Sequence, residues 1–243
     1  MNPIRIFASN STHQSMKKTP FFPLLFLFIL IGSIQAFSQI KAVTENGDTI
    51  YVYNDGTWSY ELRESSSQQG MMDFLNEAID VETLNSTFTT PSTSKDKVKN
   101  AMDQFQIFFN SEEWRRVPPA TLNDEAEFAF EAKFSDVWSV VISEETPIEK
   151  ETLFKIARKN MEDNTGAKPE TISLTQFKVN GHDILRGVMR ASFSGITFVF
   201  DTYYFSDERG SVQFTTWSSE AVWKKNEVKI QDLLKGFEVI GVE

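Results

Sequence analysis

Few side chains in this sequence could carry out acid–base or nucleophilic chemistry. The chain has no cysteine and two histidines, His13 and His182. His13 lies in an N-terminal segment with the features of an export signal, so His182 is the one imidazole expected in the mature protein. Asp183 follows it, but no G-x-S-x-G motif is present to complete a Ser–His–Asp arrangement. We therefore predict no catalytic residue and no enzymatic activity.

Metal and phosphate sites are not indicated either. With one histidine and no cysteine, a zinc ion would have to take most of its ligands from carboxylates. The calcium-loop pattern D-x-[DN]-x-[DN]-G is missing, and Asn54-Asp55-Gly56 by itself indicates only a turn. The phosphate-binding patterns G-x-G-x-x-G and G-x-x-x-x-G-K do not occur. No metal ion and no cofactor is predicted.

One carboxylate, Asp201, stands out because it lies inside the aromatic stretch FVFDTYY. Strand alternation puts it on the same face as Val199 and Tyr203. If that face is buried, the pKa of Asp201 should rise unless a donor pairs with it. Arg186 or Arg190 on the neighbouring strand could be that donor. A cross-strand salt bridge or an exposed position is favoured over a functional role.

Two aromatic residues are the candidates for partner binding. In DTIYVYNDGTWSY, residues 48–60, a β-branched and aromatic strand leads into a turn and then to Trp58 and Tyr60. Their spacing puts both side chains on one face of the returning strand. With Ile40 to Thr44 as a further strand, residues 39–62 are predicted to form a small three-stranded β-meander, too small to bury a core. Trp58 and Tyr60 are predicted to fasten this hairpin rather than to bind a small ligand.

Residues 1–38 are typical of a secretory signal. They contain bases but no acid, and the apolar run of about 14 residues from Phe21 to Ile34 is shorter than the ~20 that span a bilayer. Cleavage is predicted after Ser38, and the alternative is an uncleaved N-terminal anchor. Met16 begins a more ordinary signal than Met1 and is the predicted start of translation. The mature protein is expected to be exported, periplasmic or extracellular, and not to span the membrane.

The charge of the chain bears on its partners. Lys and Arg number 24 against 34 Asp and Glu, which gives a formal net charge of −10. Loss of the signal removes bases and no acid, so the mature protein is more acidic still. Such a surface repels nucleic acid and anionic lipid, and neither is a predicted partner. The expected partner is a protein that the sequence does not identify.

The rest of the chain divides by composition. Residues 63–100 include SSSQQG and TLNSTFTTPSTS, and they are predicted to be a mostly irregular linker. Residues 101–243 are predicted to form one domain, because about 140 residues can bury a core. Strands are predicted at Phe105 to Phe109, at Glu127 to Phe134, which alternates strictly, and at Asp136 to Ser143. Asn180-Gly181 predicts a tight hairpin between two further strands.

Two helices are predicted within this domain. Thr146 and Glu149 have capping-box spacing at the start of the first, and Gly166 stands where a left-handed C-terminal cap belongs. Ser218 or Ser219 is the predicted cap of the second. Consecutive strands with helices inserted and appended predict an α+β fold, with a mainly antiparallel sheet and helices packed on it.

The order of these elements resembles the PsbP-like fold. That fold is shared by an extrinsic photosystem II subunit, a Ran-binding nuclear transport factor and many small bacterial envelope proteins. The stretches that carry the resemblance are EFAFEAKFSDVWSVVIS, VNGHDILRGVMRASFSGITFVFDTYYFSDERGSVQFTTWS and LLKGFEVI. The resemblance implies a PsbP-like sandwich for residues 101–243 and a binding or scaffolding role, with no catalytic residue to carry over. DGTW also resembles short modules in exported proteins of Bacteroidetes-type bacteria.

Two functions remain open on the sequence. The favoured one is an exported, non-enzymatic protein that acts through protein contacts in the cell envelope. The alternative is a binding module for a small apolar or lipid-like ligand, since a concave sheet rich in Phe and Tyr could admit one.

Overall fold

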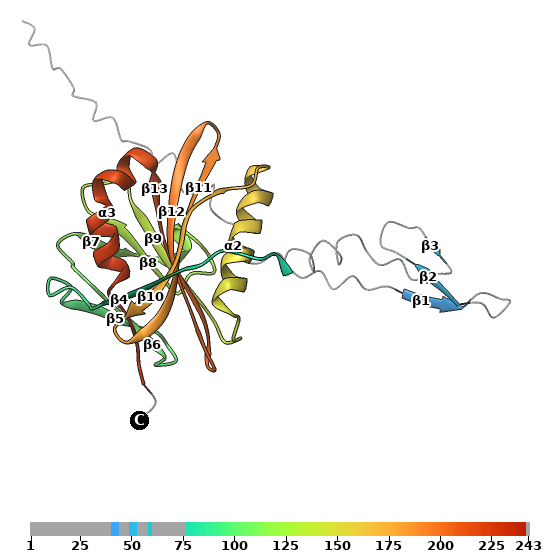
Figure 1. Cartoon of the computed structure of the whole chain (residues 1–243), viewed down its shortest axis with the longest axis horizontal. Coiled ribbons are helices and arrows are strands. Elements are labelled where there is room, and N and C mark those ends of the chain that lie inside the picture. The colour runs from blue at the N-terminus through green and yellow to red at the C-terminus, as the bar shows by residue number, and fades with distance from the viewer. Residues whose placement is uncertain (1–39, 44–48, 53–57, 60–75, 242–243) are drawn as a thin grey trace, which may run out of the picture.

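The computed structural model describes residues 40–43, 49–52, 58–59 and 76–241 of the chain (Figure 1). Near the N-terminus, β1 (Ile40–Val43), β2 (Thr49–Val52) and β3 (Trp58–Ser59) form an antiparallel sheet in that order. The predicted three-stranded meander is therefore confirmed. The turn that carries DGT lies outside the described residues, so the likeness to exported modules stays a prediction.

An eight-stranded sheet forms the centre of the remaining chain, in the order β4-β10-β11-β12-β13-β9-β8-β7. All neighbours in it are antiparallel except β4 and β10, which run parallel. The strands are β4 (Glu82–Phe88), β7 (Trp114–Val117), β8 (Phe128–Ala132), β9 (Trp138–Glu144), β10 (Glu170–Val179), β11 (His182–Phe193), β12 (Ile196–Asp207) and β13 (Gly210–Ser219). The hairpin between β10 and β11 turns at Asn180 and Gly181, both with positive φ, as predicted.

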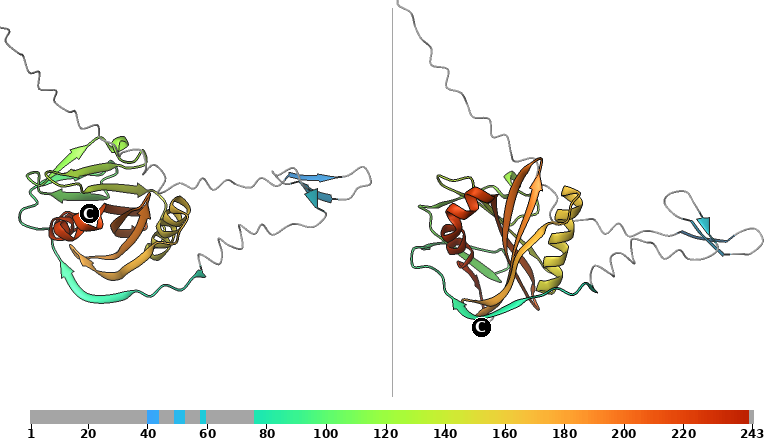
Figure 2. Two further views of the ribbon diagram at one scale, coloured as in Figure 1. Left: turned by 90° about the horizontal axis from the view of Figure 1, so that it is seen from above. Right: turned by 45° about the horizontal axis from the view of Figure 1, so that its top comes forward.

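Two helices and a second sheet cover the faces of the large sheet (Figure 2). On one face lies α2 (Lys150–Thr165), whose Leu153, Phe154 and Ala157 belong to one core cluster. On the other lies α3 (Glu220–Leu234), together with the three-stranded sheet β14 (Phe237–Val239), β6 (Phe105–Phe109) and β5 (Asp96–Lys99). A short 3-10 turn, η1 (Pro119–Thr121), follows β7. The predicted α+β fold is confirmed.

The helix ends agree with the sequence in part. Gly166 caps α2 with φ 72°, and its N–H donates to the carbonyl of Glu162. The capping box predicted for Thr146 and Glu149 is wrong, because α2 begins at Lys150 and Glu149 is its N-cap without a side-chain hydrogen bond. The carbonyl of Thr146 instead accepts a hydrogen bond from Ser211 at 3.0 Å, which ties it to β13. For α3, Ser219 is the N-cap, one of the two predicted serines.

The predicted linker at 63–100 is wrong for its second half. Strands β4 and β5 lie within it, and both belong to sheets of the folded domain. Val98 of β5 is buried, and Leu84 and Phe88 of β4 pack against the core. Thr83, Ser86 and Thr87 of the stretch TLNSTFTTPSTS lie on the edge strand β4, where threonine is favourable and one face meets water. The other five Ser and Thr of the stretch lie between β4 and β5, outside any strand. No helix among the described residues is long and apolar enough to cross a membrane.

Candidate functional site

A buried ion pair joins Asp201 of β12 to Arg186 of β11. Arg186 donates from Nε to Oδ1 at 2.8 Å and from its Nη2 to Oδ2 at 2.7 Å. Gln231 of α3 donates from Nε2 to the same Oδ2 at 2.7 Å. Asp201 is fully buried, whereas 19% of the Arg186 side chain is exposed. The carboxylate therefore ties two strands to α3.

The charge of Asp201 also acts on its neighbours. Burial, and then the negative charge of Asp201, raise the pKa of Tyr203 well above its ordinary value, so this phenol stays neutral. Burial opposes the charge on Arg186, but hydrogen bonds to Asp201 and its negative charge raise the pKa of the guanidinium. Both carboxylate oxygens are occupied by donors of the chain itself. The cross-strand salt bridge favoured by the sequence is present, and it is structural.

Arg190, the other predicted donor for Asp201, pairs elsewhere. Its Nη1 donates to Glu170 at 2.8 Å, and its Nη2 donates to Glu220 at 2.9 Å. Glu170 begins β10, and Glu220 begins α3. Arg190 therefore links the start of a strand to the start of a helix.

His182 has no catalytic partner among the described residues. It is half-buried at the start of β11, directly after the Asn180-Gly181 turn, and its ring meets Phe205 edge-on at 6.2 Å. Asp183 is its neighbour in the strand, so the two side chains point to opposite faces. Asp183 pairs with Lys178 instead. Nor does any group of three or more His, Cys, Asp or Glu able to hold a metal occur in the described part of the chain.

The turn between β8 and β9, residues 133–136, has features that folding does not explain. We call it the Phe134 turn. The side chain of Phe134 is 97% exposed, and its backbone has φ 71°. Positive φ is unfavourable for a bulky L-residue by about 1–2 kcal/mol. An exposed phenyl ring also gains no burial energy to offset that strain.

The Phe134 turn rests on a fixed base. The N–H of Ala132 donates to the carbonyl of Val137 at 2.9 Å, and the N–H of Val137 donates to the carbonyl of Ser135 at 3.0 Å. The N–H of Lys133 donates to the carbonyl of Glu113 at 2.7 Å, which joins the turn to the one between β6 and β7. Ala132 and Val137 are both buried. The turn therefore holds the phenyl ring outward on a rigid support.

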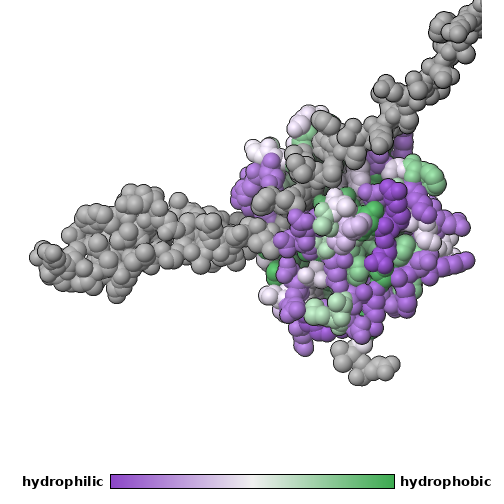
Figure 3. Space-filling model, turned by 180° about the vertical axis from the view of Figure 1, so that it is seen from behind, coloured by the Kyte–Doolittle hydropathy of each residue, from purple (hydrophilic) through white to green (hydrophobic). Residues whose placement is uncertain are grey.

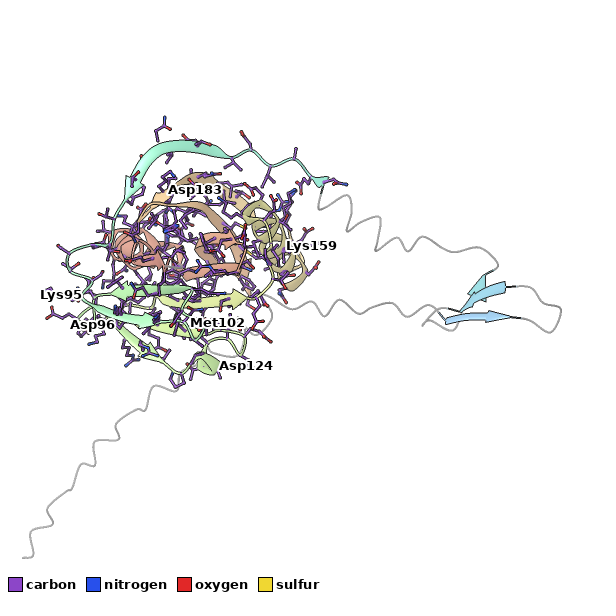
Figure 4. The ribbon with its side chains drawn as sticks, turned by 90° about the horizontal axis from the view of Figure 1, so that it is seen from below. Lys95, Asp96, Met102, Asp124, Lys159 and Asp183 are labelled. Atoms are coloured by element: carbon purple, nitrogen blue, oxygen red, sulfur yellow. The ribbon has the colours of Figure 1, made fainter. Side chains whose placement is uncertain are left out.

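Other large apolar side chains are exposed, but in ordinary backbone conformations. They are Met102 in the loop between β5 and β6 (Figure 4), Ile172, Ile196 and Val228, with exposed fractions of 41% to 76%. None of them is among the described residues with positive φ. Figure 3 shows the back of the molecule, where hydrophilic residues cover most of the coloured surface and hydrophobic ones form small separate groups. Single exposed apolar residues are common, so the strained backbone distinguishes Phe134.

The sequence did not reveal Phe134. The strand predicted from Glu127 to Phe134 alternates strictly, which would put Phe134 on the buried face with Phe128 and Phe130. In the structure β8 ends at Ala132, and the chain has already turned at Phe134. The change from strand to turn reverses the direction of the ring. The only sign of a turn in the sequence was the polar pair Ser135-Asp136 directly after this aromatic residue.

The residues predicted for partner binding lie in the N-terminal sheet. Trp58 begins β3 and pairs with Val52 of β2. Tyr60 lies outside the described residues. Their role in partner binding stays a prediction.

Comparison with known proteins identifies no family for this chain. No family model matches the chain, and no curated protein matches it in sequence. Similar solved structures include a crystal structure from Bacteroides thetaiotaomicron, at TM-score 0.41 and 10% identity over 60% of this chain and 48% of that one. This chain thus spans about half the length of that protein.

Two further structures are similar over most of their own length. The cyanobacterial PsbP of Synechocystis sp. PCC 6803 has TM-score 0.46 and 13% identity, over 61% of this chain and 94% of that one. LpqN of Mycobacterium tuberculosis is described as involved in cell envelope biogenesis. It has TM-score 0.42 and 10% identity, over 60% of this chain and 90% of that one. The predicted PsbP-like resemblance is confirmed, with a large mixed sheet, a small second sheet and two helices. At TM-scores below 0.5 this likeness carries no argument about what the chain does.

Proposed function

We propose that this chain is an exported, non-enzymatic protein that acts through protein contacts, with Phe134 as an anchor of the contact surface. The observation that carries the proposal is a 97% exposed phenyl ring held at φ 71° on a rigid turn. Strained backbone of this kind persists where the surrounding structure imposes it, and it is concentrated at functional sites. Aromatic side chains are also the residues that dominate protein–protein interfaces.

The remaining features of the described residues agree with such a role. The buried Asp201 pairs with Arg186, and the ring of His182 packs edge-on against Phe205. The small-ligand alternative would need an apolar face of the sheet to lie open. The aromatic side chains on both faces of the large sheet are instead packed, buried or partly buried, in two core clusters. No specific observation favours that alternative.

Export is the part of the proposal that rests on the N-terminal sequence. The protein purified from its own cells should begin at Gln39, because the basic start, the apolar run and Ala36-Phe37-Ser38 together form a cleavable signal. N-terminal sequencing of periplasmic and culture-medium fractions measures this. An intact Met1 or Met16 in the membrane fraction would contradict export by cleavage.

Replacing Phe134 by glycine should separate binding from folding. The free energy of unfolding should stay the same or rise by up to about 1.5 kcal/mol, because relief of about 1–2 kcal/mol of strain equals or exceeds the 0.5–1 kcal/mol that glycine costs through its freedom in the unfolded chain. Partner binding should weaken about 30-fold, as for the loss of an interface anchor worth about 2 kcal/mol. Denaturant unfolding and the yield of cross-linked complex from the cell envelope are the two measurements.

Val228→Ser provides the matched control. Val228 is 76% exposed but lies in the regular backbone of α3, and valine and serine have similar helix propensities. The control should form the complex as the wild type does. Equal complex formation by Phe134→Gly and wild type would show that Phe134 is not the anchor.

A further inference from the structure

The surroundings of Phe134 are acidic. The Phe134 turn adjoins the turn at residues 110–113 through the hydrogen bond from Lys133 N–H to the Glu113 carbonyl. Asp136 and Glu112 are exposed, and Glu113 is half-exposed. Lys133 is the one base in the two turns. None of these four side chains forms an ion pair with another described residue.

The acidic turn is held in place as firmly as the Phe134 turn. The carbonyl of Asn110 accepts from the N–H groups of Glu113 and Trp114 at 3.1 and 2.9 Å, and its side-chain oxygen accepts from the N–H of Glu112 at 3.0 Å. Trp114 is buried in the core and pairs with Ala132 at the end of β8. Both turns therefore project from the same anchored pair of strands, β7 and β8.

The nearby pair of Arg115 and Glu131 does not offset these acids. Its atoms lie 2.5 Å apart, so the two charges neutralise each other. The uncompensated charge next to Phe134 is negative, as it is for the chain as a whole at −10.

We infer that the partner of Phe134 is a protein surface with an apolar pocket rimmed by lysine or arginine side chains. This inference rests on the proposed function. A single projecting phenyl ring fits a pocket, and carboxylates beside it fit a rim of opposite charge. A second copy of this chain does not fit, because a symmetric contact through the same turn would bring the like charges of Glu112 and Asp136 together.

The experiment uses the full chain expressed in its own cells with p-benzoylphenylalanine at position 134 as the probe. Irradiation should cross-link position 134 to one protein, at a segment whose neighbouring surface carries lysine or arginine. A probe at position 228 should not cross-link to that segment. Cross-linking of position 134 to a second copy of the chain, or to a segment rimmed by acids, would overturn the inference.

Charge variants then test the rim itself. Glu112→Gln with Asp136→Asn should lower the association rate with the cross-linked partner about tenfold at low salt, because opposite charges steer the encounter. Glu145→Gln with Glu208→Gln is the matched control: it removes two exposed acids at the opposite end of the sheet and should leave the rate unchanged. Raising the salt concentration to 0.5 M should remove most of the difference in association rate between the two double variants.

The outcomes separate the two proposals. If Phe134→Gly weakens the complex while Glu112→Gln with Asp136→Asn has no effect, the protein contact stands and the basic rim is wrong. If Phe134→Gly leaves the complex intact, both proposals are wrong. If both pairs of charge variants slow association equally, the effect comes from net charge alone and the rim is again wrong.

Discussion

Replacing Asp201 by alanine is expected to lower the free energy of unfolding by about 3–5 kcal/mol, the cost of leaving a buried charge without its partner. Asp201 is fully buried and accepts from both Arg186 and Gln231. Its removal leaves Arg186, whose side chain is about four-fifths covered, without its ion-pair partner. Since most single domains are stable by only about 5–15 kcal/mol, the variant should unfold at much lower denaturant concentration. Urea or guanidinium titration followed by tryptophan fluorescence measures the shift.

Two further variants identify the cause of this loss. Adding Arg186→Met to Asp201→Ala should recover part of the stability, because a buried pair replaced by apolar groups no longer leaves a lone charge. Glu131→Gln breaks the exposed pair with Arg115 and should change stability by no more than about 1 kcal/mol. A loss below about 1 kcal/mol for Asp201→Ala would contradict a structural role for the ion pair.

Deletion of residues 1–100 is expected to prevent cooperative folding. A chain that begins at Ala101 lacks β4 and β5, and with them Phe88 and the buried Val98. Each apolar side chain of this size contributes about 1.5–3 kcal/mol on burial. The deletion also exposes the edge of β10 and removes one neighbour of β6. The summed loss approaches the total stability of a typical domain.

A chain that begins at Asn76 is the control for this deletion. It keeps both strands, and it keeps Glu77, which pairs with Arg158 and Lys168 on and after α2. It should unfold in one cooperative transition, as the full-length protein does. A transition of wild-type size in the chain that begins at Ala101 would restore the domain boundary predicted from the sequence.

Local features of the fold could be read from neighbouring residues. The positive φ at Asn180 and Gly181 follows from the two residue types themselves, and Gly166 ends α2 because glycine tolerates the left-handed conformation. The strands predicted at Glu127 to Phe134 and at Asp136 to Ser143 correspond to β8 and β9 of the large sheet. These features depend on interactions between residues close together in the sequence, so the local sequence is enough to predict them.

Pairings between distant segments could not be read in this way. Arg186 and Arg190 are each two residues from Val188, the strand partner of Asp201, so the register alone permits either as its donor. The position of α3 decides which arginine pairs with Asp201. Gln231 of α3 donates a hydrogen bond to Asp201, and Glu220 of α3 accepts one from Arg190, which holds Arg190 away from Asp201. Likewise β4 becomes a strand through its pairing with β10, about ninety residues later in the chain.

The candidate site shows most clearly the difference between local features, which the sequence predicts, and pairings of distant segments, which it does not. The strand that leads to Phe134, the acidity of the chain and its shortage of catalytic side chains could all be read from the residues alone. The end of β8 at Ala132, and the outward direction of the Phe134 ring beside the turn at residues 110–113, became known from the folded structure. The end of a strand depends on where its partner strand stops pairing, and local sequence does not contain that information. That point is set by hydrogen bonds to residues elsewhere in the chain, here the one from Lys133 N–H to the carbonyl of Glu113.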